Sequence, residues 1–271
     1  MATGVDDTRA PVYADLHSDQ LLKQEDLNRA SARLILSLLF ERFRPRSVLD
    51  VGCGIGTWLA VAQELGVKDL AGVDGEWLDR KLARIRPELL RSLDLEKAFD
   101  LGRRFDLVVC LEVAEHLSAG AAEGFVGSLT RHADVVLFSA AIPMQGGHHH
   151  VNEQFPEYWA RIFEAADYAV VDFLRPQIWY CSDVLPWLRQ NAMVFARREL
   201  TEGSGPFADI QPGPVPLSMV HPEMYVARLE SSKTALEQHA MLVELLLAGK
   251  TVSAVRNPDG SLTLHSKDQG N

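Results

Sequence analysis

The sequence predicts an α/β protein built on a doubly wound, mainly parallel sheet. Short apolar runs of strand length alternate along residues 26–198 with segments whose apolar residues recur at helical spacing. The run at 107–110 is apolar at every position, which is typical of a parallel strand buried on both faces. A glycine-rich turn at 50–56 joins the first expected strand to a helix. In sheets of this kind, ligands bind at the carboxyl ends of the strands.

The first half of the sheet follows from the order of these runs. Apolar residues at helical spacing predict a helix over 26–43, which Pro45 ends before a strand at 47–51. A helix from about 57 to 65 comes next and is closed by Gly66. The remaining expectations of this half are a strand at 70–73, a helix at 78–85 and a strand at 89–95.

The second half continues the alternation as far as residue 199. Its first expected elements are strands at 105–111 and 135–140 and helices at 118–132 and 156–166. Two further strands are expected at 168–175 and 192–198, and only a short helical excursion at 181–190 separates them. Because a parallel pair needs a full crossover helix, we expect an antiparallel pair at this edge.

Composition shifts divide the chain into four segments. They are an N-terminal segment with a cap helix at 1–45, a sheet domain at 46–199, a Pro- and Gly-rich linker at 200–221, and a tail at 222–271. The tail predicts a helix at 222–248 and a hairpin whose strands, 251–256 and 261–265, flank Asn-Pro-Asp-Gly. So small a unit is expected to dock on the sheet domain or on a second subunit, and a homodimer through the tail is one expectation.

Composition bounds the class of protein. The chain has 271 residues, of which 47% are hydrophobic, and this is ample for one α/β domain with additions. No apolar run approaches the roughly 18 residues of a membrane helix, and the polar N-terminus lacks a signal-peptide pattern. Three cysteines without metal-like spacing favour a cytoplasmic protein. The formal charge of −10 disfavours a polyanionic partner such as nucleic acid.

The glycine turn predicts a cofactor site. Its glycines remove Cβ atoms that would block a ligand, and the helix that follows presents free N–H groups. Asp74 ends the next expected strand, where a carboxylate can accept hydrogen bonds from ribose hydroxyls. Asp94 ends the third strand and could accept a hydrogen bond from an adenine amino group. The glycine pattern alone also occurs in dinucleotide-binding domains, so these acidic residues narrow the choice of cofactor.

At this point the chain resembles class I S-adenosylmethionine-dependent methyltransferases over about residues 30–199. The motifs that carry the resemblance are VLDVGCGIG at 48–56, GVD at 72–74, LDL at 93–95, FDLVVCLEVAEHL at 105–117 and VVLFSAAIP at 135–143. The resemblance implies a seven-stranded Rossmann-like sheet of order 3-2-1-4-5-7-6 with the last-numbered strand antiparallel, and S-adenosylmethionine as cofactor.

The same resemblance assigns roles to individual residues. It places Asp50, Gly52 and Gly54 along the methionine part of the cofactor, Asp74 at the ribose with Trp77 beside the cofactor, Asp94 and Leu95 at the adenine, and Leu111 on the floor of the cofactor site. Each also has a structural interpretation. The carboxylates could cap turns, and Trp77 could serve in packing alone.

Histidines follow the fourth and fifth expected strands, on the side where the methyl acceptor would bind. His116 lies in Glu-Val-Ala-Glu-His, and the loop at 146–154 reads Gly-Gly-His-His-His-Val-Asn-Glu-Gln. An alcohol acceptor benefits from a base of near-neutral pKa, most often histidine. Some small-molecule methyltransferases have a similar loop, and that resemblance favours His149 or His150 as the base. The supporting residues of this hypothesis are Asn152 and Glu153, which would orient the base or the substrate, and Trp179 and Tyr180, which could wall the acceptor pocket.

A divalent metal is an open alternative that the sequence does not favour. Glu112, Glu115, His116 and a loop histidine have suitable ligand types, and the pattern resembles that of small-RNA 3′-terminal 2′-O-methyltransferases. The leading hypothesis is therefore O-methylation of a hydroxyl on a small molecule, such as a sugar or a specialised metabolite. The alternatives are N-methylation of a small molecule, metal-dependent RNA 2′-O-methylation, and a cofactor-binding partner protein without catalysis.

Overall fold

A computed structural model describes residues 24–76, 80–210, 217–248, 250–256 and 262–268. The chain divides into two compact units, 1–221 and 222–271. Within the described residues, no helix combines the length and the apolarity that crossing a bilayer requires.

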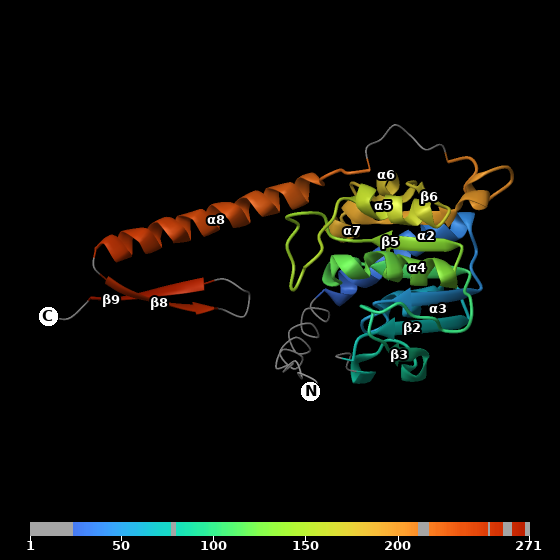
Figure 1. Ribbon diagram of the computed structural model, residues 1–271, viewed down its shortest axis with the longest axis horizontal. Helices are drawn as coiled ribbons and strands as arrows, with labels where there is room; N and C mark the ends of the chain where they lie inside the picture. The colour runs from blue at the N-terminus through green and yellow to red at the C-terminus, as the bar shows by residue number, and fades with distance from the viewer. Residues whose placement is uncertain (1–23, 77–79, 211–216, 249, 257–261, 269–271) are drawn as a thin grey trace. The chain divides into compact units, whose positions relative to one another are not determined.

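The first unit is built on one seven-stranded sheet (Figure 1). Its strands lie in the order β3-β2-β1-β4-β5-β7-β6. β7 pairs antiparallel with both β5 and β6, and the remaining pairs are parallel. The predicted order and the antiparallel last strand are therefore confirmed. The strands are β1 (Ser47–Val51), β2 (Asp69–Asp74), β3 (Leu90–Ser92), β4 (Leu107–Leu111), β5 (Val135–Ser139), β6 (Tyr168–Val171) and β7 (Met193–Arg197).

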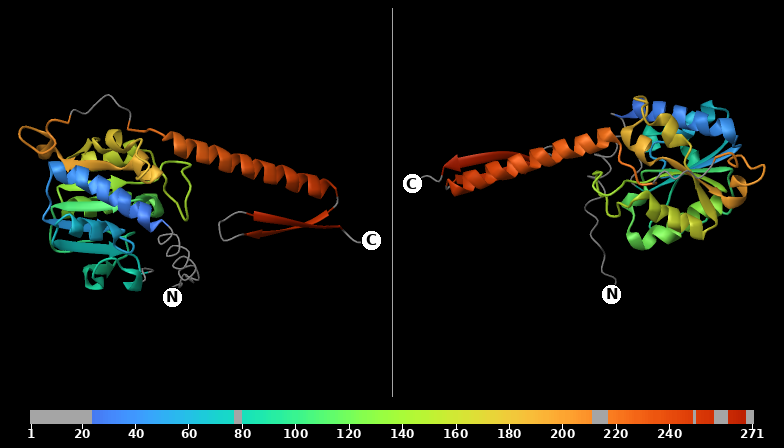
Figure 2. Two further views of the ribbon diagram at one scale, coloured as in Figure 1. Left: turned by 180° about the vertical axis from the view of Figure 1, so that it is seen from behind. Right: turned by 90° about the horizontal axis from the view of Figure 1, so that it is seen from above.

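Helices cover both faces of this sheet, as the view from above shows (Figure 2). One face carries α2 (Glu25–Arg42), α3 (Thr57–Glu64), α6 (Leu174–Ile178) and α7 (Pro186–Asn191). The other face carries α4 (Ala122–His132) and α5 (Pro156–Ala165). Each face buries its own apolar cluster, because continuous apolar strands need cover on both sides.

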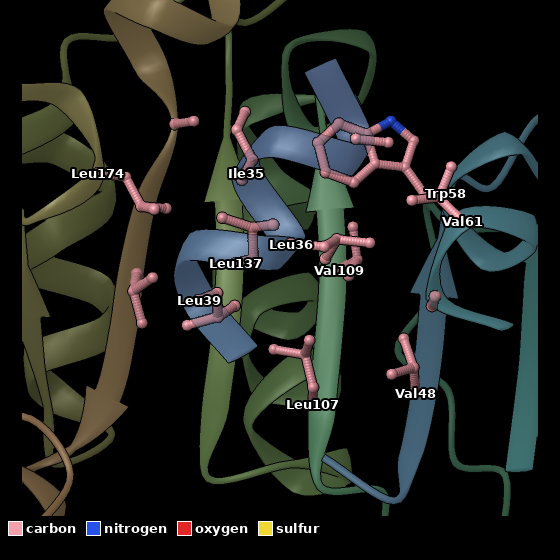
Figure 3. Close-up of a cluster of buried hydrophobic side chains, with 14 of the residues drawn as sticks. Ile35, Leu36, Leu39, Val48, Trp58, Val61, Leu107, Val109, Leu137 and Leu174 are labelled. Carbon is pink, nitrogen blue, oxygen red and sulfur yellow. The ribbon is translucent and has the colours of Figure 1, made fainter. Parts of the chain in front are cut away.

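The α2 helix closes the first of these clusters. Ile35, Leu36 and Leu39 point from α2 onto the sheet, where Leu137 and Val109 come from β5 and β4 (Figure 3). All five side chains are buried. Their spacing along α2 follows the helical period that predicted this helix.

Several of the expected elements differ from the observed ones. The strand expected at 89–95 spans only Leu90–Ser92, so Asp94 lies beyond its end. The helix expected at 78–85 is wrong: two short 3₁₀ turns, Arg80–Leu82 and Pro87–Leu89, stand there, with 77–79 outside the described residues. Pro87 cannot continue an α-helix from the preceding turn. The strand expected at 168–175 ends at Val171, and α6 follows it. The helix expected from 118 begins with a 3₁₀ turn, Ala119–Ala121, before α4.

The second unit contains one long helix and one hairpin. The helix is α8 (Pro222–Leu247), and β8 (Lys250–Arg256) pairs antiparallel with β9 (Leu262–Asp268). The expected turn residues at 257–260 lie outside the described residues.

The packing of α2 gives a test of the fold. Leu36 is a fully buried residue of α2, so we expect Leu36→Ala to lower the free energy of unfolding by about 2–5 kcal/mol. Leu27 lies on the same helix but is 36% exposed, so Leu27→Ala is the matched control and should cost less than about 1 kcal/mol. Urea denaturation measures both, and equal losses would contradict the packing of α2 on the sheet.

Candidate functional site

The turn after β1 brings bare backbone to the carboxyl edge of the sheet. Gly52, Gly54 and Gly56 have φ values of +78°, +50° and +83°, which favour glycine. A Cβ atom on Gly52 would lie 2.2 Å from Cγ2 of Val113, so a larger residue does not fit there. Gly56 then caps the N-terminus of α3. The free N–H groups of a helix N-terminus suit an anionic group of a ligand.

Asp74 joins the end of β2 to this turn. Its carboxylate accepts hydrogen bonds from the backbone N–H groups of Gly54 (2.6 Å) and Gly75 (2.7 Å). Each carboxylate oxygen has a second lone pair, so further acceptance from ribose hydroxyls fits this geometry. The ribose role of Asp74 stays a prediction that this geometry allows, and the same bonds also shape the turn.

Asp50 is a buried carboxylate in the middle of the site. Its side chain is almost fully buried, and Oδ2 has no hydrogen-bond partner. Burial raises the pKa of Asp50 well above its usual value, and the nearby Asp74 carboxylate raises it further. A cationic group bound beside Asp50 would relieve both effects, and S-adenosylmethionine carries an ammonium and a sulfonium group. The donor set of this turn thus fits that cofactor.

The residues predicted at the adenine end lie in different environments. Leu95 is buried, and Leu111 is a half-buried residue at the end of β4. Asp94 is half exposed and pairs with Nζ of Lys97 at 2.9 Å. The Lys97 hydrogen bond lowers the pKa of Asp94, so a role at the adenine remains a prediction that competes with this ion pair. Trp77 lies outside the described residues.

Backbone hydrogen bonds hold the histidine loop against the turn that follows β4. The N–H groups of Val151 and Asn152 donate to the carbonyl oxygen of Glu115 at 2.9 and 3.0 Å. The N–H of Gln154 donates to the carbonyl of Ala141 at 3.1 Å. Two loops that are distant in the sequence therefore meet at the carboxyl edge of the sheet.

His150 is the loop histidine that the fold positions most fully. Its Nδ1 lies 2.9 Å from Oε1 of Glu153, and its ring stands edge-on to the His116 ring at a centroid distance of 4.9 Å. The backbone N–H groups of Met144 and Gly146 also donate to the Glu153 carboxylate. Partial burial raises the pKa of Glu153, but the hydrogen bonds from His150 and the two amides outweigh it and lower the pKa. Glu153 is therefore ionised at neutral pH and orients His150.

The other residues predicted on the acceptor side differ in their burial and in their contacts. His149 is exposed, with φ of +56°. Asn152 is buried, and its Oδ1 accepts a hydrogen bond from Gln154. Trp179 packs against His221 with ring centroids 4.7 Å apart, and Tyr180 is 90% exposed. The contacts of Trp179 and Tyr180 give no support for an acceptor wall, and that role stays a prediction.

The predicted site residues do not include a partly buried amide network around Glu112. The Glu112 carboxylate accepts hydrogen bonds from Nε2 of Gln145 (2.9 Å) and Nδ2 of Asn191 (3.2 Å), and Gln190 also donates to Gln145. Burial raises the pKa of Glu112, partly offset by bonds from Ser139 and the two amides. Gln145 and Asn191 belong to no motif, so only their meeting in space identifies them.

Glu115, His116 and His150 form a compact cluster of potential ligands. One ligand atom from each lies within 4.8 Å of the other two. Glu115 is fully buried, and neither carboxylate oxygen has a hydrogen-bond partner of good geometry. Burial and the neighbouring Glu112 raise the pKa of Glu115 well above its usual value, and backbone N–H groups offset this only in part. The residue types suit a divalent cation as well as a shared proton.

Comparisons with known proteins agree with the expected class of domain. Residues 23–132 match the family model described as a methyltransferase domain. No curated protein matches the sequence. Residues 23–132 are therefore similar to methyltransferase domains, and the strand order is that of the class I methyltransferase fold.

Solved structures share the fold at low sequence identity. The sugar N-methyltransferase KedS8 from Streptoalloteichus sp ATCC 53650 is 22% identical with a TM-score of 0.52, over 67% of this chain and 92% of that one. The plantazolicin methyltransferase BpumL, in complex with a monoazolic desmethylPZN analog and SAH, is 16% identical with a TM-score of 0.51, over 69% and 91%. Phosphoethanolamine N-methyltransferase 1 of Haemonchus contortus is 16% identical with a TM-score of 0.51, over 72% and 50%.

The raised pKa of Asp50 predicts opposite effects on stability and on cofactor binding. The unfolded carboxyl ionises near pH 3.9, whereas the folded one holds its proton to higher pH. Ionisation therefore disfavours the folded state increasingly as the pH rises through this window. We therefore expect the stability of Asp50→Asn relative to the wild type to increase as the pH rises above about 4.

The same variant should bind S-adenosylmethionine at least tenfold more weakly, because a neutral amide does not offset the positive charge of the cofactor (about 1.4 kcal/mol). Urea denaturation at several pH values and calorimetric titration with the cofactor measure the two effects. A wild-type protein that gains stability over Asp50→Asn as the pH rises would contradict the prediction.

Proposed function

We propose that this protein transfers a methyl group from S-adenosylmethionine to a hydroxyl of a small molecule, with His150 as the general base. The observation that carries the proposal is the His150–Glu153 pair, which lies on the loop after β5 and contacts the turn after β4. Two of the solved structures that share the fold are a sugar N-methyltransferase and a plantazolicin methyltransferase. These two names are consistent with a small-molecule acceptor. The acidic net charge of −10 argues against an RNA acceptor.

The chemistry follows from the orientation of the imidazole. With Nδ1–H donating to Glu153, Nε2 keeps its lone pair and can take the acceptor proton. The oxygen then forms a bond to the methyl carbon while the carbon–sulfur bond of the cofactor breaks. The Glu153 carboxylate stabilises the imidazolium that results, as in other carboxylate–histidine pairs. A hydroxyl needs such a base more than an amine does, which is why we favour O-methylation over N-methylation.

Substitution of His150 tests the base. We expect His150→Ala to lower turnover by about 10²–10⁴-fold with unchanged affinity for S-adenosylmethionine, because general bases contribute rate enhancements of that order. His148→Ala is the matched control, since His148 is an exposed neighbour on the same loop. His149→Ala tests whether His149 rather than His150 is the base, a choice that the sequence left open.

The assay supplies labelled S-adenosylmethionine with pools of hydroxylated and aminated small molecules and identifies the product by mass and regiochemistry. Full turnover by a His149/His150 double alanine variant that still binds cofactor would contradict the proposed base. Products methylated on nitrogen would favour the N-methyltransferase alternative.

A metal-assisted O-methyltransferase is the second candidate, and the Glu115–His116–His150 cluster is the observation that favours it. A divalent cation there would polarise the acceptor hydroxyl. Because Nε2 of His150 cannot both bind a metal and take a proton, the two candidates are experimentally separable. This candidate predicts that Mn²⁺ binds one site in a calorimetric titration, that Glu115→Gln abolishes binding, and that chelator stops turnover. Full turnover in chelator would exclude this candidate.

We further propose that the second unit mediates self-association. The described side chains of α8 include no buried residue, and Tyr225, Leu229, Leu236 and Val243 are each 41–70% exposed. A helix beside one two-stranded hairpin is only marginally stable by itself. Removing residues 222–271 should therefore change a dimer into a monomer, measured by light scattering, without loss of cofactor affinity. A full-length protein that is already monomeric at high concentration would contradict this.

A further inference from the structure

The loop at 144–153 folds tightly around one carboxylate. Glu153 accepts hydrogen bonds from the amides of Met144 and Gly146 and pairs with the imidazole of His150. The chain reaches this arrangement through several unusual backbone angles. Positive φ values occur at Met144 (+70°), Gly146 (+80°), Gly147 (+153°) and His149 (+56°). Such a concentration of residues with positive φ is costly, and it persists only where the surrounding hydrogen bonds hold the loop in this path.

Gly147 lies on the loop beside the edge of the His150 ring that carries Nε2. A Cβ atom built on Gly147 would stand 2.2 Å from Nε2 of His150, 2.3 Å from Cε1 and 2.9 Å from Cδ2. All three distances are shorter than any normal non-bonded contact. The volume that a side chain would fill at position 147 is therefore already taken by the imidazole. Nε2, the atom proposed to take the acceptor proton, lies next to the α-carbon of Gly147, which carries no side chain.

We propose that Gly147 is a positioning residue for His150, a role that rests on the proposed function of His150 as the base. The absence of a Cβ lets the ring lie where Nδ1 reaches Glu153 and the ring edge reaches His116. A methyl group at position 147 would either push the ring away from Glu153 or cover Nε2.

The imidazole is the part that would move. It is the far end of a side chain with two rotatable bonds, whereas the backbone around it is held by hydrogen bonds. The N–H of Gly146 is bonded to Glu153, and the N–H groups of Val151 and Asn152 are bonded to Glu115. Gly147→Ala should therefore keep the fold and the cofactor site while displacing the base.

The test compares Gly147→Ala with Gly66→Ala in the full-length protein. Gly66 also has a positive φ, +102°, but a Cβ there would meet nothing within 4 Å. Both variants carry the backbone strain of alanine in this region, so a difference between them isolates the contact with His150. The measurements are Tm, S-adenosylmethionine affinity, methyl transfer to an acceptor found for the wild type, and the ¹H–¹⁵N signal of the His150 Nδ1 proton, assigned by its loss in His150→Ala.

We expect Gly147→Ala to lose the Nδ1 signal and at least tenfold in kcat, with cofactor affinity unchanged. Gly66→Ala should keep the signal and turnover within twofold of the wild type. A Gly147→Ala protein that retains both the signal and turnover overturns the proposal. Loss of the signal with full turnover supports the positioning role and instead contradicts the assignment of His150 as base.

A double variant keeps the proposal testable if Gly147→Ala does not fold. Adding His150→Ala removes the ring that the new methyl group meets, so the double variant should recover the fold. The Tm penalty of Gly147→Ala should accordingly be smaller in the His150→Ala background than in the wild type. An equal penalty in both backgrounds overturns the proposal, because it would show that residue 147 and His150 do not interact.

Discussion

The parallel pairing of β1 with β2 on one side and β4 on the other is the constraint on which the site depends. This register aligns the ends of the three strands, so that Asp50, Asp74 and Leu111 approach one edge of the sheet. Parallel strands bury both faces and leave only their ends for polar groups. The apolar packing of α2 and α3 on one face and of α4 and α5 on the other holds that edge in place.

The edge concentrates carboxyl groups that water would otherwise solvate. Burial raises the pKa values of Asp50, Glu112 and Glu115, whereas Glu153 is held ionised by its hydrogen bonds to His150 and to backbone amides. The first group carries a cost that a cationic cofactor or a shared proton can offset. The ionised Glu153 carboxylate can orient the His150 ring, to which it is hydrogen-bonded.

Much of the fold could be predicted from the sequence because periodicity is local. Continuous apolar runs marked the buried strands, and the lack of a full crossover helix before the last strand indicated its antiparallel direction. The helix expected at 78–85 is wrong, because apolar spacing there was not long enough to outweigh Pro87. The strand expected at 168–175 was too long, because an apolar run does not show where β6 ends and α6 begins.

The sequence by itself determined the fold class, because hydrophobic periodicity and the glycine turn are local features of the chain, whereas the cofactor role of that turn stays a prediction. Only the tertiary structure singled out His150 among three adjacent histidines. That choice depends on Glu153, on the carbonyl of Glu115 and on the bare α-carbon of Gly147. It also brought Gln145 and Asn191 to Glu112. The contacts of Glu112 and of the Glu115 carbonyl join segments far apart in the chain, so no local pattern of residues encodes them. Glu153 and Gly147 are near neighbours of His150, and their contacts with it depend on the path of the folded loop.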